Sequence, residues 1–178
     1  PIVNALMALM CFHSSRFQSR INHIGEPILY EEQDKSLWNE ELIEKGNYYL
    51  IESAKGEEIS KYHIEASIAY WHSTKIENST KWESILKLYN QLLQIEYSPI
   101  AALNRTYALS KVFGKEKAIH EALKLNLNEN HFYHSLLGNL HTNYDNKKAI
   151  FYYEEALKFA KSNSDKLTIE TNLKKLIC

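Results

Sequence analysis

The sequence predicts an all-α protein: its few helix-breaking residues, its composition and a repeating pattern of small residues all favour that fold class. Only 5 glycines and 3 prolines interrupt 178 residues, fewer than the turns of a many-stranded fold require. Hydrophobic residues make up 44% of the chain and charged residues 24%, which suffices for a globular core. We therefore expect long helices joined by short polar links.

The N-terminal third is expected to contain two helices and an ordered loop. Apolar residues at helical spacing predict a first helix over residues 2–16, and the segment that contains Gly25 and Pro27 ends it. Asp34 or Ser36 is expected to cap a second helix that ends near Lys55. Residues 1–58 would thus form an N-terminal helical segment with an acidic loop.

Helix pairs are expected from Tyr62 onward, because small and apolar residues recur there at a nearly constant spacing. The first helices of three pairs carry Ala69, Ala102 and Gly138, spaced by 33 and 36 residues, and the second helices carry Ile85, Ala118 and Ala149, spaced by 33 and 31. Such a period with such markers resembles the tetratricopeptide repeat. Residues 59–178 are accordingly expected to stack as a right-handed, tetratricopeptide-like superhelix, continuous with the N-terminal segment.

Capping residues support this division into helices. The expected helix starts from residue 80 onward are Thr80 in a capping box with Glu83, Ser98 before Pro99, Asn128, Asp145 and Ser164–Asp165. The last helix would run to about Leu176, where Leu167, Leu173 and Leu176 could cover the end of the stack.

Charge and cysteine content narrow the classes of function. The formal net charge is -1, from 21 Lys and Arg against 22 Asp and Glu, and the interleaved signs offer little of the cationic surface that nucleic acids require. Cys11 and Cys178 are too few for a disulfide framework, which favours a reducing compartment, the cytoplasm. The apolar run over residues 5–12 is too short to cross a membrane.

Neither metal binding nor catalysis is predicted. His131, His134 and His141 have no Cys or carboxylate at ligand spacing. Acidic residues cluster at 31–34, but helix capping explains them more simply than acid/base catalysis or cation binding. The sequence has no phosphate loop, nucleophile elbow or Cys-His pair. We therefore expect a protein that is not an enzyme and needs no cofactor.

Several separated strings together resemble the region that follows the DNA-binding domains in one group of bacterial extracytoplasmic-function RNA polymerase sigma factors. The strings are Leu6-Met7-Ala8-Leu9-Met10 with His13 and Arg16, Leu29 to Asn39, Tyr62 to His72, Ser98 to Arg105, and Tyr133-His134 with Ala149 to Leu157. Two positions depart from the family pattern: Lys35 replaces an arginine and Asn39 an aspartate. Any salt bridge that the family makes at those two positions is therefore in doubt here.

The resemblance implies a C-terminal regulatory domain that takes part in transcription initiation. Its partners would be the N-terminal sigma domains of the same chain and the RNA polymerase core, and promoter DNA would be contacted only by those N-terminal domains. Residue 1 is a proline inside an apolar run rather than an initiator methionine, so the chain is expected to be part of a longer protein.

The candidate site is a polar seam in which the loop around Asp34 and Trp38 meets Asn104 and Arg105, with the concave face of the repeats left for the partner. Its candidate residues are His13, Arg16, Asp34, Trp38, His72, Asn104, Arg105 and Tyr133. A free-standing peptide-binding adaptor and a small-molecule sensor remain alternatives, because a groove between helix pairs would serve either one.

Overall fold

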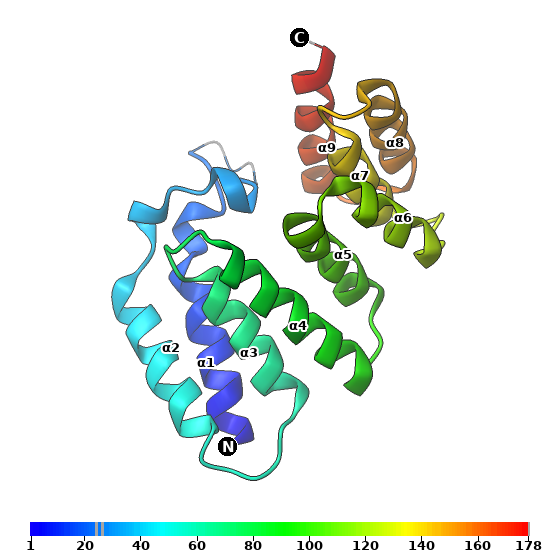
Figure 1. The fold of residues 1–178 in the computed structure, drawn as a ribbon. Coiled ribbons are helices and arrows are strands. Elements are labelled where there is room, and N and C mark those ends of the chain that lie inside the picture. Colours follow the sequence, from blue (N-terminus) through cyan, green and yellow to red (C-terminus); the bar gives the residue numbers. More distant parts are fainter. Residues whose placement is uncertain (24, 26, 178) are drawn as a thin grey trace. The chain divides into compact units, whose positions relative to one another are not determined.

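A computed structural model describes residues 1–23, 25 and 27–177, and this part of the chain is helical (Figure 1). Its helices are α1 (Ile2–Ser15), α2 (Glu40–Ser53), α3 (Lys61–His72), α4 (Ser79–Ile95), α5 (Pro99–Phe113), α6 (Lys115–Leu125), α7 (His131–His141), α8 (Asn146–Phe159) and α9 (Asn163–Ile177). Short 3-10 turns, η1 (Phe17–Ser19), η2 (Tyr30–Glu32) and η3 (Lys35–Leu37), lie between α1 and α2. Within the described residues, β-pairing is limited to an isolated bridge between Ile21 and Pro27. The all-α prediction is confirmed.

The chain divides into two compact units, Pro1–Tyr97 and Ser98–Cys178. We expected a segment boundary near residue 58 within one continuous domain; in the structure α1 packs against both α2 and α3, so the N-terminal segment and the first predicted helix pair form one unit. Sequence periodicity did not reveal this, because the markers of the repeat begin only at α3. The expected superhelix would span both units, and it stays a prediction.

The first unit is built around the side of α1 that faces α2 and α3. Phe12 is fully enclosed there, and Ala8, Ala66 and Ala69 complete the cluster. Gly46 brings the backbone of α2 so close that a Cβ at this position would stand 2.6 Å from Cε1 of the Phe12 ring. Close helix approach here depends on small residues, as it does in the predicted repeats.

The second unit stacks helix pairs in chain order. Contacts join α5 to α6, α7 to α8 and α8 to α9, and α7 also contacts both α5 and α6. Such nearest-neighbour packing is typical of helical repeats. The predicted markers Ala102, Ala118 and Ala149 are buried, and Gly138 lies against the ring of Tyr153, as close approach of α7 and α8 requires. Ile169, Leu173 and Leu176 of α9 pack against Tyr153, Ala156 and Ala160.

The helix starts were predicted in part. Ser98 and Asp145 cap α5 and α8 as expected. Asparagines cap three other helices: Asn39 caps α2 in place of Asp34 or Ser36, Asn78 caps α4 in place of Thr80, and Asn130 caps α7 in place of Asn128. Near the start of α9, the backbone N–H of Asp165 donates to Ser162 Oγ at 3.0 Å. These shifts move the ends of helices without changing their number or order.

None of the helices in the described ranges combines the length and the hydrophobicity that a membrane crossing requires.

Candidate functional site

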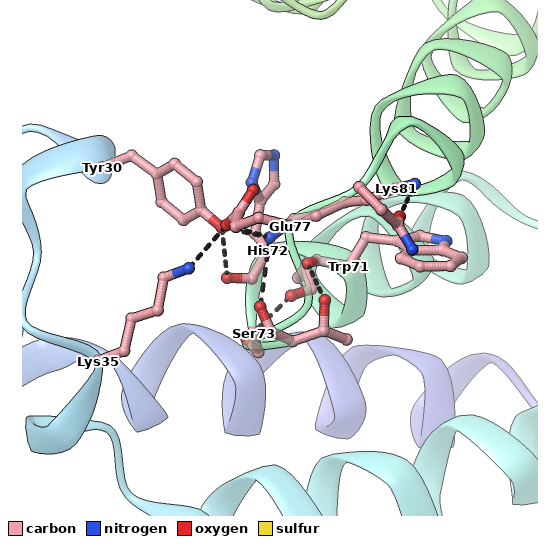
Figure 2. A network of polar contacts seen from close by, with 10 residues as sticks. Tyr30, Lys35, Trp71, His72, Ser73, Glu77 and Lys81 are labelled. Atoms are coloured by element: carbon pink, nitrogen blue, oxygen red, sulfur yellow. Dashed lines mark hydrogen bonds and ion pairs between the residues drawn. The ribbon is translucent and has the colours of Figure 1, made fainter. Parts of the chain in front are cut away.

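Side chains of the segment from η2 to the start of α2 contact the end of α1, the end of α3 and the start of α4. Tyr30 Oη donates to the backbone carbonyl of His72 at 3.1 Å, and Trp38 Nε1 donates to Ser19 Oγ at 3.1 Å. Figure 2 shows Tyr30 and Lys35 reaching from this segment towards the end of α3. We use the name polar cluster for Arg16, Tyr30, Lys35, Trp38, His72, Glu77 and Lys81.

Lys81 is the most enclosed ionisable group of the polar cluster, with 0% of its surface exposed. Its ammonium donates to Tyr30 Oη at 2.8 Å, to the carbonyl of Thr74 at 3.2 Å and to Glu77 Oε1 at 2.9 Å. Burial lowers its pKa, and the carboxylate of Glu77 opposes that effect. The three acceptors match the three N–H donors of a charged lysine, so the group is satisfied as an ammonium.

Glu77 bridges two lysines. Lys35 Nζ lies 2.8 Å from Glu77 Oε1, the same oxygen that Lys81 contacts. Burial alone would raise the pKa of Glu77, but the hydrogen bonds from Lys35 and Lys81 outweigh it and hold the pKa below its usual value. The carboxylate therefore stays ionised and fixes the 35–38 turn to the start of α4.

Aromatic rings surround the end of α3. The ring of His72 meets Tyr30 edge to face at 4.9 Å between centroids and Trp82 at 5.8 Å. Burial, reinforced by the charges of Arg16 and Lys81, lowers the pKa of His72 to about 3. Burial and the charge of Glu77 raise the pKa of Tyr30 to about 12. Both shifts keep His72 and Tyr30 uncharged near neutral pH.

Arg16 closes the polar cluster from the end of α1. The guanidinium carbon lies 5.3 Å from the centroid of the Tyr30 ring and 6.0 Å from that of Trp38, within the range of cation–π attraction. Burial, together with the charge of Arg20, lowers its pKa to about 10. A neighbouring pair joins Arg20 Nη2 and His13 Nδ1 at 3.0 Å.

The structure brings four of the eight predicted site residues together. His13, Arg16, Trp38 and His72 lie in or beside the polar cluster. Asp34 lies on the exposed side of the same segment, where its carboxylate accepts from the backbone N–H of Ser36 at 2.8 Å. It therefore caps the short turn η3 rather than a helix.

The other three predicted residues belong to the second unit. Asn104 is exposed and Arg105 half-buried on α5. The pKa of Glu121 is lowered mainly by its hydrogen bond with Lys124. The charges of Lys124 and Arg105 lower it further. Tyr133 is buried, with its ring 5.3 Å from that of His134. The seam between these residues and the loop stays a prediction.

The histidines of α7 form ring stacks. His134 lies parallel to Phe159 at 5.5 Å, and His141 lies parallel to Tyr152 at 5.3 Å. His134 Nε2 also lies 2.7 Å from the carbonyl of Asn128. In the part of the chain that the structure describes, no group of three or more His, Cys, Asp or Glu side chains could hold a metal ion.

Sequence reasoning missed Tyr30, Glu77 and Lys81. The spacing of Glu77 and Lys81, four residues apart, could have indicated an ion pair. It could not have indicated burial, because Tyr30, which contacts the Lys81 ammonium, lies 51 residues earlier in the chain.

Comparison with known proteins places the chain beside relatives without an assigned activity. Residues 1–54, which include His13, Arg16, Tyr30 and Trp38, match a family described as "Family of unknown function (DUF6596)". An uncharacterized protein of Rhizobium meliloti (strain 1021) is 33% identical over 143 residues, which is 79% of this chain and 34% of the relative. The chain thus spans about a third of the length of the curated relative that it matches. No solved structure matches the chain.

Proposed function

We propose that this chain is a C-terminal regulatory domain of an extracytoplasmic-function sigma factor. It would contact the N-terminal sigma domains of the same protein or the RNA polymerase core during transcription initiation in the cytoplasm. Promoter DNA would be read by the other domains, because the interleaved charges of this sequence offer little of the extended cationic surface that DNA requires.

One observation carries the proposal. The strings that resemble the sigma-factor family lie far apart in the sequence, yet residues from three of them meet in the polar cluster. Arg16 comes from the first string, Tyr30 and Trp38 from the second, and His72 from the third. The residues that carry the resemblance therefore include side chains that pack together in one folded unit, which supports the proposal.

The architecture suits a partner of protein rather than small-molecule size. Helix pairs that contact only their neighbours leave extended side surfaces, and such repeats commonly bind peptides or helices. Asn104 on α5 and Asp34 beside the polar cluster are exposed polar groups within the resembling strings. We expect them to contribute to contacts rather than to folding.

The test uses a full-length protein that contains this chain. Promoter-specific transcription and pull-down of polymerase subunits would be measured with and without residues 1–178, and with Asp34→Ala and Asn104→Ala. Lys87→Ala, an exposed change on α4 outside the resembling strings, is the matched control. We expect deletion to change transcription at the cognate promoter several-fold, the two site variants to change it in the same direction, and the control to behave as wild type.

Two results would count against this function. If deletion of residues 1–178 leaves promoter-specific transcription unchanged, the regulatory role fails. If no sigma domains precede the chain and it binds a peptide partner, it is a peptide-binding adaptor instead.

A further inference from the structure

Arg16 is a buried cation without a partner of opposite charge. Its side chain is 7% exposed, and its Nε is enclosed without a hydrogen-bond partner. No carboxylate among the described residues stabilises its charge, and its pKa is lowered by burial and then by the charge of Arg20. A buried guanidinium with a free donor costs free energy unless an anion offsets it.

The groups around Arg16 increase this imbalance. Arg20 Nη2 lies 3.0 Å from His13 Nδ1, and partial desolvation of the ring, followed by the charges of Arg20 and Arg16, lowers the pKa of that histidine. On the other side, the charge of Arg16 contributes to lowering the pKa of Lys81, for which burial is the main cause. Basic groups thus approach Arg16 from α1, the following segment and α4.

The one carboxylate of the polar cluster is already engaged. Glu77 accepts from Lys35 at 2.8 Å and from Lys81 at 2.9 Å. Two lysines therefore share one negative charge, and Arg16 and Arg20 keep theirs. Among the described residues no carboxylate raises the pKa of Arg16 itself, although Glu31 acts on the neighbouring Tyr30.

The aromatic contacts of Arg16 fix the guanidinium without using its N–H donors. The rings of Tyr30 and Trp38 attract the cation through their faces, which are not conventional hydrogen-bond acceptors. Because Nε is enclosed, the Nη groups are the ones left to donate paired hydrogen bonds to an oxyanion. His13 is exposed and Arg20 half-exposed, so an anion could approach from their side.

We propose that His13, Arg16 and Arg20 form a binding site for a small oxyanion, in which Arg16 supplies the paired donors and Arg20 additional charge. The ligand carries a phosphate or a carboxylate group, the two chemistries that a guanidinium fork recognises. Binding would stabilise the first unit through the contacts that Arg16 makes with Tyr30 and Trp38. This site goes beyond the proposed regulatory function and does not depend on it.

The experiment follows the Nε–H resonance of Arg16 in the 178-residue chain by two-dimensional NMR. Inorganic phosphate and acetate are titrated separately against sodium chloride at matched ionic strength. We expect a saturable shift of the Arg16 signal with at least one of the two oxyanions and none with chloride. The anion that binds more tightly identifies the group that the natural ligand carries.

Variants assign the binding to these residues. Arg16→Gln and Arg20→Gln should each weaken affinity at least tenfold, followed for Arg16→Gln through backbone amides of residues 13–20. Arg20 is the more exposed of the two, so its variant keeps the test decisive if Arg16→Gln does not fold. Lys87→Gln removes an equal charge from the exposed face of α4 and should leave affinity unchanged.

Three outcomes would overturn the proposal. The first is that neither oxyanion moves the Arg16 signal. The second is that Lys87→Gln weakens binding as much as Arg20→Gln does, which would indicate a general charge effect. The third concerns Glu26, which lies outside the described residues: binding that occurs only in Glu26→Gln would show that a carboxylate of the chain itself occupies the site.

Discussion

Lys81 shows how a charged side chain can be tolerated in the interior of a small helical unit. Its ammonium exchanges water for three acceptors, Tyr30 Oη, the Thr74 carbonyl and Glu77 Oε1. In Lys81→Met those acceptors lose their donor, while the apolar stem is largely replaced. We expect the free energy of unfolding to fall by about 2 kcal/mol, measured by urea denaturation.

A second lysine provides the control for this prediction. Lys45 pairs with Glu41 one turn earlier on α2, and both side chains are exposed. Lys45→Met should therefore have no measurable effect, because exposed pairs contribute little to stability. Equal effects of the two substitutions would show that the enclosure of Lys81 does not matter.

His72 predicts a specific acid sensitivity. Its pKa is about 3 in the folded chain against 6.5 in the absence of the fold, so the unfolded chain takes up the proton first as the pH falls. Above pH 6.5 His72 is neutral in both states and does not affect the free energy of unfolding. Between pH 6.5 and 3 only the unfolded chain is protonated at this ring, so the free energy of unfolding falls progressively. The shift corresponds to at most about 5 kcal/mol, and because the ring is only partly enclosed we expect roughly 2–3 kcal/mol.

The measurement compares wild type with His72→Phe, which keeps a ring against Tyr30 and Trp82 but cannot be protonated. Chemical denaturation at several pH values should give a steeper loss of stability below pH 6.5 for wild type than for the variant. Parallel curves would mean that His72 is protonated equally in both states.

At the scale of single residues, site residues were predicted because they lie in strings that resemble the sigma-factor family. Their contacts in the folded chain could not be predicted. Arg16, Trp38 and His72 were predicted site residues and do meet in the first unit. Tyr30 and Lys81 were not, because their roles depend on a loop that folds back over α3 and α4. No local pattern encodes that path.

Helix positions were predicted more securely than helix starts. Apolar periodicity and the spacing of small residues indicated where the helices lie, whereas several caps lay within a few residues of equally suitable polar side chains. Asn39 illustrates the choice: its backbone N–H donates to the carbonyl of Ser15 at 2.8 Å, and its side chain accepts from Leu42 N at 3.0 Å. The contact with the end of α1 selects Asn39 over Asp34 and Ser36.

Asn39→Ala tests this assignment. The backbone bond to Ser15 survives and the side-chain cap of α2 is lost, so stability should fall by about 1 kcal/mol, measured by thermal or urea denaturation. Asp34→Ala affects only the three-residue turn η3 and should cause a smaller change. The opposite ranking would restore Asp34 as the cap of the helix.

Gly46 controls how closely α1 and α2 approach. A methyl group there would overlap the ring of Phe12, which is fully enclosed and cannot move aside. Overpacking of this kind costs about 1–3 kcal/mol, more than the gain of up to about 1 kcal/mol in helix propensity. We therefore expect Gly46→Ala to be destabilising, although the same change on an open helix face would stabilise.

A double-mutant cycle separates steric overlap from other effects of Gly46→Ala. Phe12→Leu alone should be destabilising because it leaves a cavity, but it should cost less in the Gly46→Ala background, where it relieves the overlap. Additive costs would show that the ring and the new methyl group do not compete for space.

For the whole molecule, the sequence predicted the helical class and the pairing of neighbours but not the division of the chain. The markers of the repeat recur only from Tyr62 onward, so residues 1–58 were expected to be an N-terminal segment that precedes the repeats. Nevertheless, α1 and α2 pack on α3 in the way that one helix pair packs on the next. The period was hidden because Gly46 and Phe12 bring α1 and α2 together without the spacing that marks the later pairs.

The division between Tyr97 and Ser98 predicts that damage to one unit stays local. Gly46→Ala should increase amide hydrogen exchange in residues 1–97 and leave 98–177 unchanged, because local opening follows the contacts of each cooperative unit. Gly138→Ala, which pushes a methyl group to 2.9 Å from the Tyr153 ring, should do the reverse. The amides of each unit report on that unit, so the double variant should show both effects unaltered. Faster exchange throughout the chain in either single variant would mean that the two units unfold as one.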